Sequence, residues 1–565
     1  MEKVKKVSDF EYKRVTQEEV IAVMKTATEI VKNASSVEEI LSVRNGIVKD
    51  INCKFETQYA LGYMRYTCNT KDEFYQAEKE YYDQVIPVIM QAQNEYFDAM
   101  LNTPFRKDLE KVLGESLFKK YEFAKKAHSP LTVEYEQEEN AITTEYSKLM
   151  AEMKFVWEGE QVPMAIVRGK LQSGDREIRR KAAESIGQGL KANADKLDDI
   201  YDRLVKVRDK MAKKLGYKDY VELGYYNMAR VDYNREMVEN FRNNVVKDIT
   251  PAVKKLKGQM AEKLGINQIT FYDDAIFNVG KQPEPILTPQ GILDAGLEMY
   301  KEMSPITGEF MQRMMDAEAF DVLSRDGKWG GGYCINFPDF NQPFILANFN
   351  GSSGDVDVIT HEFGHALAMD FISKYGDYEL AIGGNETAEC HSMSMEFFCW
   401  KFMEKFFGED CNKYLYKHLL DSFCFIPYGC MVDEFQHIVY SNPEQTPAER
   451  KQAWLMLEEK YRPYLVNDGI PYIEEGTRWQ YQMHIYESPF YYIDYCLAQT
   501  VALGFLTEAQ KDYQDAFNRY IEFCKAGGTK TFPKLIEDAK LPNPFGNGTL
   551  SEIAKNVLNL AKQLQ

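Results

Sequence analysis

Residues 355–371 read Asp-Val-Asp-Val-Ile-Thr-His-Glu-Phe-Gly-His-Ala-Leu-Ala-Met-Asp-Phe, and this stretch decides what kind of fold to expect. Its pattern predicts a helix that closes near Gly376. The helix carries His361, Glu362 and His365 in the order His-Glu-x-x-His. At about 100° per residue, the two histidines lie roughly 40° apart around the helix and one turn apart along it. Both imidazoles can therefore reach one ion.

This spacing is typical of zinc enzymes. Two imidazoles suit Zn²⁺, and Glu362 beside them can accept a proton from a water molecule without being a ligand itself. The main alternative is a helical scaffold in which the pattern is fortuitous and the two histidines lie on a solvated face. The surrounding helix is apolar, however, and two uncompensated histidines there would need partners. The sequence therefore predicts one catalytic zinc per chain.

A catalytic zinc needs a third protein ligand and keeps a fourth position for water. The extended metzincin pattern would place Gly at 368 and His at 371, where this chain has Ala368 and Phe371. A third histidine on that extension is thus excluded, and a glutamate is the remaining choice.

Two glutamates near the start of a second predicted helix compete for that role. Glu386 and Glu389 follow a Gly-Gly break, and Asn385 is expected to be the N-cap. Both carboxylates lie on the first turns at a separation of three, so they face roughly the same way. An acidic residue near a helix N-terminus also has a sufficient role with the helix dipole. Spacing alone leaves both open.

A short β-sheet is expected just before the histidine helix. Residues 326–335 and 343–349 contain short apolar runs bounded by Gly, Pro and Asn, which predict two strands. Glycines 330–332 read as a tight loop, since no strand-glycine-helix order of a nucleotide site follows them. Either strand could pair with an extended peptide by strand addition.

The rest of the chain is predicted to be helical. Thr16 with Glu19, and Ser36 with Glu39, are expected helix starts. Long amphipathic stretches follow at about 72–100, 104–127, 135–156 and 175–215. At 565 residues the chain exceeds the size of one compact core, so we expect an N-terminal helical domain at 1–195 and a catalytic domain at 196–565.

Composition limits the class of partner and the compartment. With 68 Lys and Arg against 87 Asp and Glu, the formal charge is -19, which disfavours a general binder of nucleic acid or anionic membranes. No apolar signal segment opens the chain, and no run approaches the roughly 18 to 20 apolar residues of a membrane span. The 10 cysteines are scattered without a CxxC pair. A cytoplasmic protein with reduced thiols is expected.

Several stretches resemble the oligoendopeptidase F and thimet oligopeptidase family of zinc peptidases. His361–His365 matches the core motif of the family, and 389–396 is similar to its Glu-x-x-Ser element, whose first Glu is the third ligand. Residues 171–182 and 212–220 also resemble oligoendopeptidase F, so the resemblance spans about 170 to 500. It implies Glu389 as the ligand. It also implies a mainly α, two-subdomain zincin-type fold with a small β-sheet beside a deep substrate channel.

The family resemblance further implies an element near the C-terminus in which tyrosines follow a histidine. Here it is similar to residues 484–495. Tyrosine hydroxyls and an imidazole N–H can donate to the oxyanion that develops when water attacks a peptide carbonyl. His484, Tyr492 and Tyr495 are assigned to this role, with Tyr492 preferred to Tyr491. Tyr492 and Tyr495 are expected to share a helix face.

The remaining histidines receive structural interpretations. His128, His418 and His437 are read as surface groups or as satisfied core groups. His391 points to another side of its helix than Glu389. Metal-bound imidazoles need acceptors for their free N–H groups, and Glu396 or Asp355 could supply them.

The sequence thus predicts a zinc-dependent endopeptidase that hydrolyses oligopeptides, with Glu362 as the base. The alternatives are an aminopeptidase or dipeptidase, and a catalytically silent peptide-binding protein of the same fold.

Overall fold

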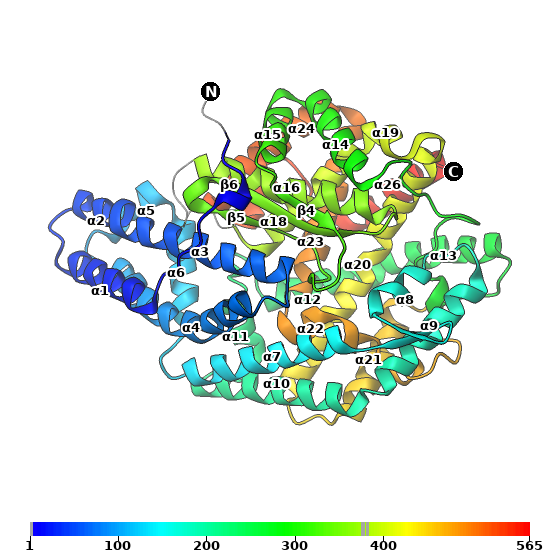
Figure 1. Cartoon of the computed structure of the whole chain (residues 1–565), viewed down its shortest axis with the longest axis horizontal. Coiled ribbons are helices and arrows are strands. Elements are labelled where there is room, and N and C mark those ends of the chain that lie inside the picture. Colours follow the sequence, from blue (N-terminus) through cyan, green and yellow to red (C-terminus); the bar gives the residue numbers. More distant parts are fainter. Residues whose placement is uncertain (1–3, 375–378, 380–382) are drawn as a thin grey trace.

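The computed structural model describes residues 4–374, 379 and 383–565, and it is mainly α-helical (Figure 1). The helices of the first half are α1 Gln17–Asn33, α2 Val37–Val43, α3 Lys49–Cys68, α4 Glu73–Asn102, α5 Arg106–Leu113, α6 Glu115–Ala127, α7 Val133–Glu152, α8 Met164–Lys170, α9 Arg176–Lys191, α10 Ala194–Lys214, α11 Tyr220–Asn227, α12 Arg235–Asn244 and α13 Thr250–Leu264.

The second half continues in the same style. Its helices are α14 Pro289–Met303, α15 Pro305–Asp316, α16 Gly354–Lys374, α18 Asn385–Phe398, α19 Glu404–Phe407, α20 Cys411–Ser441, α21 Pro447–Tyr461, α22 Met483–Glu487, α23 Tyr492–Lys511, α24 Tyr513–Ala526, α25 Phe532–Asp538 and α26 Thr549–Gln563. The prediction of a mainly α fold with only small sheets is confirmed.

The first helices form a lobe at the left of Figure 1. Its apolar side chains, from Val15 to Tyr121, make a small core of their own. The two predicted helix starts are confirmed. Thr16 and Glu19 form a capping box, and the Ser36 hydroxyl accepts the Glu39 N–H.

Two stretches predicted as single helical runs are each divided into two helices. The run at 104–127 is broken because Gly114 has a φ of 87°, a left-handed conformation that ends α5 and redirects the chain into α6. The run at 175–215 is broken between Lys191 and Ala194, where α9 ends and α10 begins. Hydrophobic periodicity continued across both breaks and so did not reveal them.

The predicted β-sheet has three strands. β6 Gln342–Phe349 is the central strand, antiparallel to β5 Tyr333–Phe337 and parallel to β4 Phe320–Leu323. The first predicted strand thus begins at Tyr333, later than expected, because 326–332 form a turn and loop. β4 was missed, since only Val322 among its four residues is buried and it carries no clear alternation. Two-stranded pairs are formed by β1 Phe155–Trp157 with β2 Glu160–Val162, and by β3 Ile269–Thr270 with β7 Leu465–Val466.

Three helices are layered at the centre of the molecule. α18 packs against α16 on one side and against α23 on the other, and α16 also packs against β5 and β6. Gly364 allows the close approach of α16 and α18, because a Cβ there would lie 2.5 Å from the His391 carbonyl oxygen. The predicted helix break near Gly376 lies outside the described residues.

The division of the chain into 1–195 and 196–565 stays a prediction. The proposed boundary falls at the start of α10, and buried residues from Val7 to Ala561 contribute to one large core. The N-terminal lobe adds the second, smaller core. Within the described part of the chain, none of the helices has the length and apolar character that crossing a bilayer requires.

Candidate active site

α16 and α18 bring three predicted metal ligands together. One ligand atom from each of His361, His365 and Glu389 lies within 4.8 Å of the others. The Glu389 Oε2 atom is 3.3 Å from His361 Nε2 and 3.6 Å from His365 Nε2. In the described residues no other group of His, Cys, Asp and Glu has this geometry. The arrangement follows from the helix spacing of the two histidines and the close contact at Gly364.

The Glu389 carboxylate is held on both oxygens. Its Oε2 accepts the Ser392 hydroxyl at 3.1 Å, and its Oε1 accepts the Tyr491 hydroxyl. Burial alone would raise the pKa of Glu389, but the hydrogen bonds and positive charge of His361 and His365 lower that pKa far below its ordinary value. This carboxylate is therefore ionised and directed at the histidine pair.

A chain of hydrogen bonds behind His361 orients its ring. The Trp400 indole N–H donates to His418 Nδ1 at 3.0 Å, so the His418 proton sits on Nε2 and donates to Glu396 Oε2 at 2.7 Å. Glu396 Oε1 in turn accepts the His361 Nδ1–H at 2.6 Å. His361 Nε2 then faces Glu389, and it is the ring nitrogen that is placed to bind a metal ion.

These hydrogen bonds identify which carboxylate accepts the Nδ1–H of His361. Glu396 takes the position, as expected for one of the two options. Asp355 does not, because its carboxylate accepts the backbone N–H groups of Asn350 and Gly351 at the start of α16. The sequence predicts His418 only as a surface group or a satisfied core group. No sequence pattern signals its contact with Glu396, since α20 supplies His418 from another part of the chain.

Glu362 lies beside the ligand cluster and is 8% exposed. Burial raises the pKa of this carboxyl, and the positive charge of the neighbouring histidines opposes that rise. Glu362 Oε1 is also 4.0 Å from the position of a Cβ on Gly332, at the start of the small sheet. The predicted base therefore faces the space between α16 and β5.

His484 is held in one tautomer on the other side of the cluster. The Gln482 carbonyl oxygen accepts the hydroxyls of Tyr428 and Tyr492, so its amide N–H is left to donate to His484 Nδ1 at 3.0 Å. Burial lowers the pKa of His484 to about 4. The ring is thus neutral, with a proton on Nε2 that it can donate.

The tyrosines of this element are placed differently from one another. Tyr495 lies with its hydroxyl 3.5 Å from His484 Nε2, and the Tyr491 ring stacks on His484 at a centroid distance of 5.8 Å. Tyr492 is buried, and its hydroxyl points to Gln482. Tyr491, the less favoured residue of the pair, is the one whose hydroxyl reaches Glu389.

Glu386 lies apart from the three ligand atoms. It is buried, and its carboxylate accepts the Tyr233 hydroxyl at 3.1 Å. The same hydroxyl lies 3.4 Å from Asp494, which pairs with Arg230. Asn385 is the first residue of α18, so it does not cap the helix as expected; Gly384 occupies the cap position without a side-chain bond.

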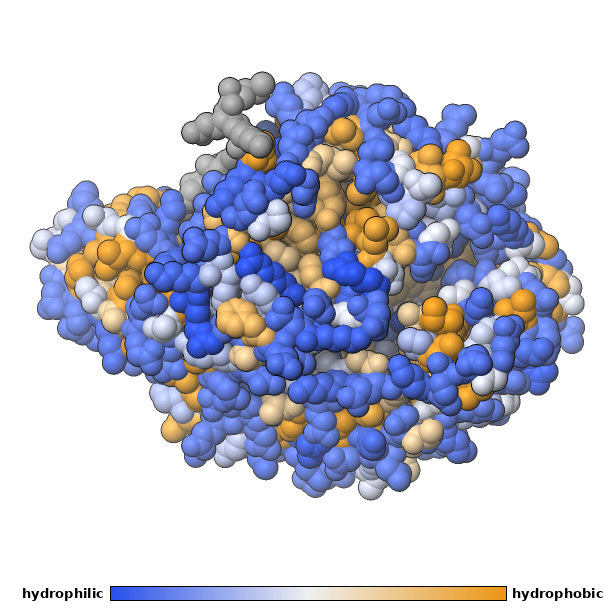
Figure 2. Space-filling view, viewed as in Figure 1, coloured by the Kyte–Doolittle hydropathy of each residue, from blue (hydrophilic) through white to orange (hydrophobic). Residues whose placement is uncertain are grey.

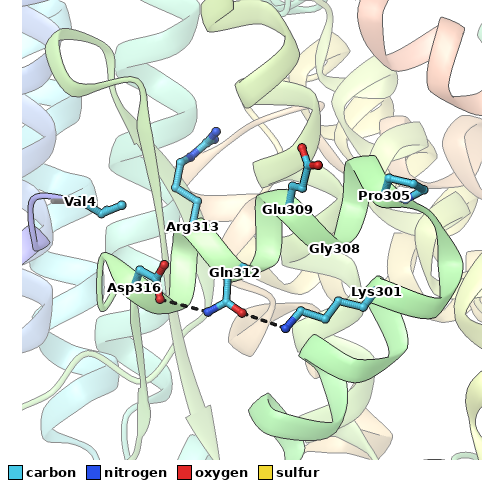
Figure 3. A pocket seen from close by; sticks show the side chains of 8 residues that line it. All are labelled: Val4, Lys301, Pro305, Gly308, Glu309, Gln312, Arg313 and Asp316. Carbon is cyan, nitrogen blue, oxygen red and sulfur yellow. Dashed lines mark hydrogen bonds between the residues drawn. The ribbon is translucent and has the colours of Figure 1, made fainter. Parts of the chain in front are cut away.

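The face of the molecule in Figure 2 is largely hydrophilic, with scattered apolar patches and a hollow right of the centre. A separate pocket of about 380 Å³ lies on α14 and α15 (Figure 3). Lys301, Gln312 and Asp316 are joined by hydrogen bonds along its floor. None of the predicted site residues lines this pocket, so it is separate from the ligand cluster.

Comparisons with known proteins agree with the predicted family. The model of "Peptidase family M3" matches residues 170–554, and "Peptidase M3 N-terminal domain" matches residues 7–128. A solved structure described as "PZ peptidase A with inhibitor 2" is 41% identical, with a TM-score of 0.95, over 98% of this chain and 99% of that chain.

Two curated relatives are more distant. The oligopeptidase PepF of Bacillus subtilis is 24% identical over 66% of this chain, and the match spans 56% of that protein. An oligoendopeptidase F homolog of Borreliella burgdorferi is 23% identical over 79% of this chain and 75% of its own length. Together with the family models, these matches confirm the resemblance seen in the motifs, and the chain belongs to peptidase family M3.

Proposed function

We propose that this protein is a zinc-dependent endopeptidase that hydrolyses oligopeptides. The observation that carries the proposal is the convergence of His361, His365 and Glu389 beside Glu362. Two imidazoles and one carboxylate are the ligand set of many catalytic zinc sites, and such a set leaves one position free. The names of the relatives, oligopeptidase and oligoendopeptidase, favour oligopeptides as the substrate class.

The residues present fit a zinc ion. His361 has its Nδ1–H directed to Glu396, so Nε2 is the ring nitrogen left to bind an ion at the centre of the cluster. Glu389 is ionised, as a ligand must be. When bound, zinc supplies Lewis-acid chemistry and lowers the pKa of a water molecule.

The chain's own residues then divide the remaining work. Glu362 accepts the proton of the attacking water and delivers it to the leaving amine, as its buried position beside the cluster allows. His484 and Tyr495 donate to the oxyanion, because His484 is neutral and carries its proton on Nε2. We assign Tyr492 a supporting place in this group, through the Gln482 amide that orients His484.

Of the two predicted strands, only β5 lies at an edge of the sheet, where an extended peptide can pair with it. β6 is paired on both sides, so the segment 343–349 cannot accept a further strand. The Ile345 N–H donates to the Ala319 carbonyl on the β4 side, so Ile345 does not hydrogen-bond its β5 partner Cys334. The N–H and C=O groups of Cys334, and those of Asn336 two residues later, therefore point away from β6. We propose that substrate pairs with the β5 edge at these two residues.

The compartment is part of the proposal. All 10 cysteines are free thiols, which fits a reducing compartment such as the cytoplasm. An aminopeptidase or dipeptidase, and a catalytically silent peptide-binding protein, remain the alternatives that product analysis would reveal.

Metal binding tests the ligand set. We predict one zinc per chain, and a loss of at least about 10- to 100-fold in zinc affinity in Glu389→Gln. Glu386→Gln serves as the matched control, because Glu386 bonds Tyr233 and should change the affinity only a few-fold. Competition with a chelator of known affinity measures both variants. The reverse ordering would move the third ligand to Glu386.

A further inference from the structure

Arg478 is an arginine without a polar partner close to the proposed site. It begins a short 3-10 helix, Arg478–Tyr481, in the segment that leads to His484. Its Nε and Nη1 atoms are buried and have no hydrogen-bond partner. Among the buried and half-buried arginines of the described residues, Arg478 alone makes no hydrogen bond or ion pair. Buried polar groups normally have partners, so this guanidinium requires an explanation.

Two aromatic rings hold the Arg478 guanidinium in place. Its central carbon lies 4.3 Å from the centroid of the Tyr428 ring and 5.7 Å from that of Phe271. Stacking on aromatic rings orients the planar group and leaves its N–H fork available in the plane. The side chain is therefore fixed without its donors being used.

The charges around Arg478 do not balance it. The charge of Asp274 raises the pKa of Arg478, but Asp274 already forms ion pairs with Lys257, at 3.2 Å, and with Arg462. Glu458 lies 3.5 Å from Arg462 and offsets that second cation. One positive charge is left over, on Arg478. A buried charge without a counterion is costly, so an anion bound there would remove an existing penalty.

Two side chains link Arg478 to His484, one of the predicted oxyanion donors. Tyr428, on which it stacks, donates its hydroxyl to Gln482 at 2.9 Å, and Gln482 orients His484. Tyr428 and Gln482 thus connect Arg478 to His484, the proposed oxyanion donor. The peptide chain itself is the obvious source of an anion at this position.

We propose that Arg478 binds a carboxylate of the peptide substrate, either the C-terminal carboxylate or an Asp or Glu side chain. The inference rests on the proposed function. A guanidinium binds a carboxylate through two parallel N–H···O bonds, which gives both orientation and affinity. Arg478 would then set the distance between a substrate carboxylate and the bond that is cleaved.

Matched peptides test this role. One pair differs only in a free or amidated C-terminus, and a second pair differs only in one internal Asp or Asn. With the zinc-loaded protein, we expect kcat/KM to favour the carboxylate member of one pair by about 10- to 100-fold, typical of hydrogen bonds to charged groups. The pair that shows the preference identifies the source of the carboxylate.

Substitutions then assign the preference to the residue. Arg478→Gln should reduce the ratio within the discriminating pair to less than about twofold, and Arg478→Lys, which keeps the charge but loses the fork, should give an intermediate ratio. Because the ratio compares two substrates on one variant, a lower fraction of folded protein cancels. Arg168→Gln, at an exposed arginine on α8, is the control and should keep the wild-type ratio.

Equal kcat/KM for both members of both pairs in the wild type would overturn the inference and leave the proposed function intact. So would a preference that persists in Arg478→Gln. If the wild type cleaves none of the peptides, the proposed function fails, and calorimetric binding of the same pairs to Glu362→Gln tests carboxylate binding by Arg478 separately. Tighter binding of the carboxylate member that is lost when Arg478→Gln is added would support carboxylate binding by Arg478. Equal binding of both members would refute it.

Discussion

A single methyl group at Gly364 should dismantle the metal site. In Gly364→Ala the new Cβ would lie 2.5 Å from the His391 carbonyl oxygen and 2.7 Å from the Ser392 Cα, where ordinary contact begins at 3.4 Å. Both neighbours are backbone atoms of α18, so no side chain can rotate away. The two helices would have to separate by about 0.9 Å.

This separation is large for a zinc site. α16 carries His361 and His365, and α18 carries Glu389, so the movement draws the carboxylate away from both imidazoles. Zinc–ligand distances in proteins vary by only about 0.2 Å. Overpacking of this kind also costs about 1–3 kcal/mol of stability. We expect the zinc affinity of Gly364→Ala to fall by at least about 100-fold.

Chelator competition on purified protein measures the affinity, and circular dichroism confirms that the variant is folded. Gly258→Ala is the matched control, because Gly258 lies in α13 and its would-be Cβ meets no atom within 4 Å beyond its chain neighbours and the backbone of its own helix. That control should keep wild-type zinc affinity. A folded Gly364→Ala protein with wild-type affinity would refute the argument that close helix contact builds the site.

Two further predictions concern the buried histidines. Trp400→Phe removes the N–H that fixes the tautomer of His418, and it should weaken zinc binding about 10-fold. The helical signal in circular dichroism should be unchanged. Wild-type zinc affinity in this variant would show that these hydrogen bonds do not affect the metal site. Burial lowers the pKa of His437, so the unfolded chain takes up a proton near pH 6.5 and the folded protein takes it up only at a lower pH. The free energy of unfolding should therefore fall from pH 7 to pH 5, and His437 contributes up to about 1.4 kcal/mol per pH unit below pH 6.5. Urea unfolding with chelator present should show a smaller fall in His437→Gln. Equal pH dependence in wild type and variant would contradict this role of His437.

Much of the site was predictable because it lies on short, regular stretches. His361 and His365 are placed by helix geometry alone, and a single helix also brings Glu386 and Glu389 into view. The choice between these two needed the family's Glu-x-x-Ser element, since spacing left it open. In the structure Glu389 faces the histidines and Glu386 turns to Tyr233.

The parts that the sequence did not predict depend on contacts between distant elements. His418 reaches Glu396 only because α20 packs against the layer that contains α18. Of the two predicted strands, only β5 is an edge strand, because β4, which the sequence did not predict, pairs with the other side of β6. No local pattern encodes either pairing.

The position of Tyr491 beside Glu389 depends on the backbone conformation of Phe490. Phe490 has a φ of 68°, which is unusual for a bulky side chain, and α23 begins only at Tyr492. The Gln436 side chain accepts the Phe490 N–H at 2.9 Å, and Arg230 donates to its carbonyl. This clamp sets Tyr491 against Glu389 at the start of the helix, a geometry that a continuous-helix reading of the segment could not show.

The most direct test of the account is the turnover of Glu362→Gln with zinc bound. Wild type and variant are each shown by elemental analysis to carry one zinc, and then digest the same peptide mixture, whose fragments are read by mass spectrometry. The account predicts cleavage at internal bonds by the wild type and a loss of at least about 100-fold in the variant, since an amide cannot accept the water's proton. A zinc-loaded variant with near-normal turnover would contradict the role of Glu362, and release of terminal residues alone would contradict an endopeptidase.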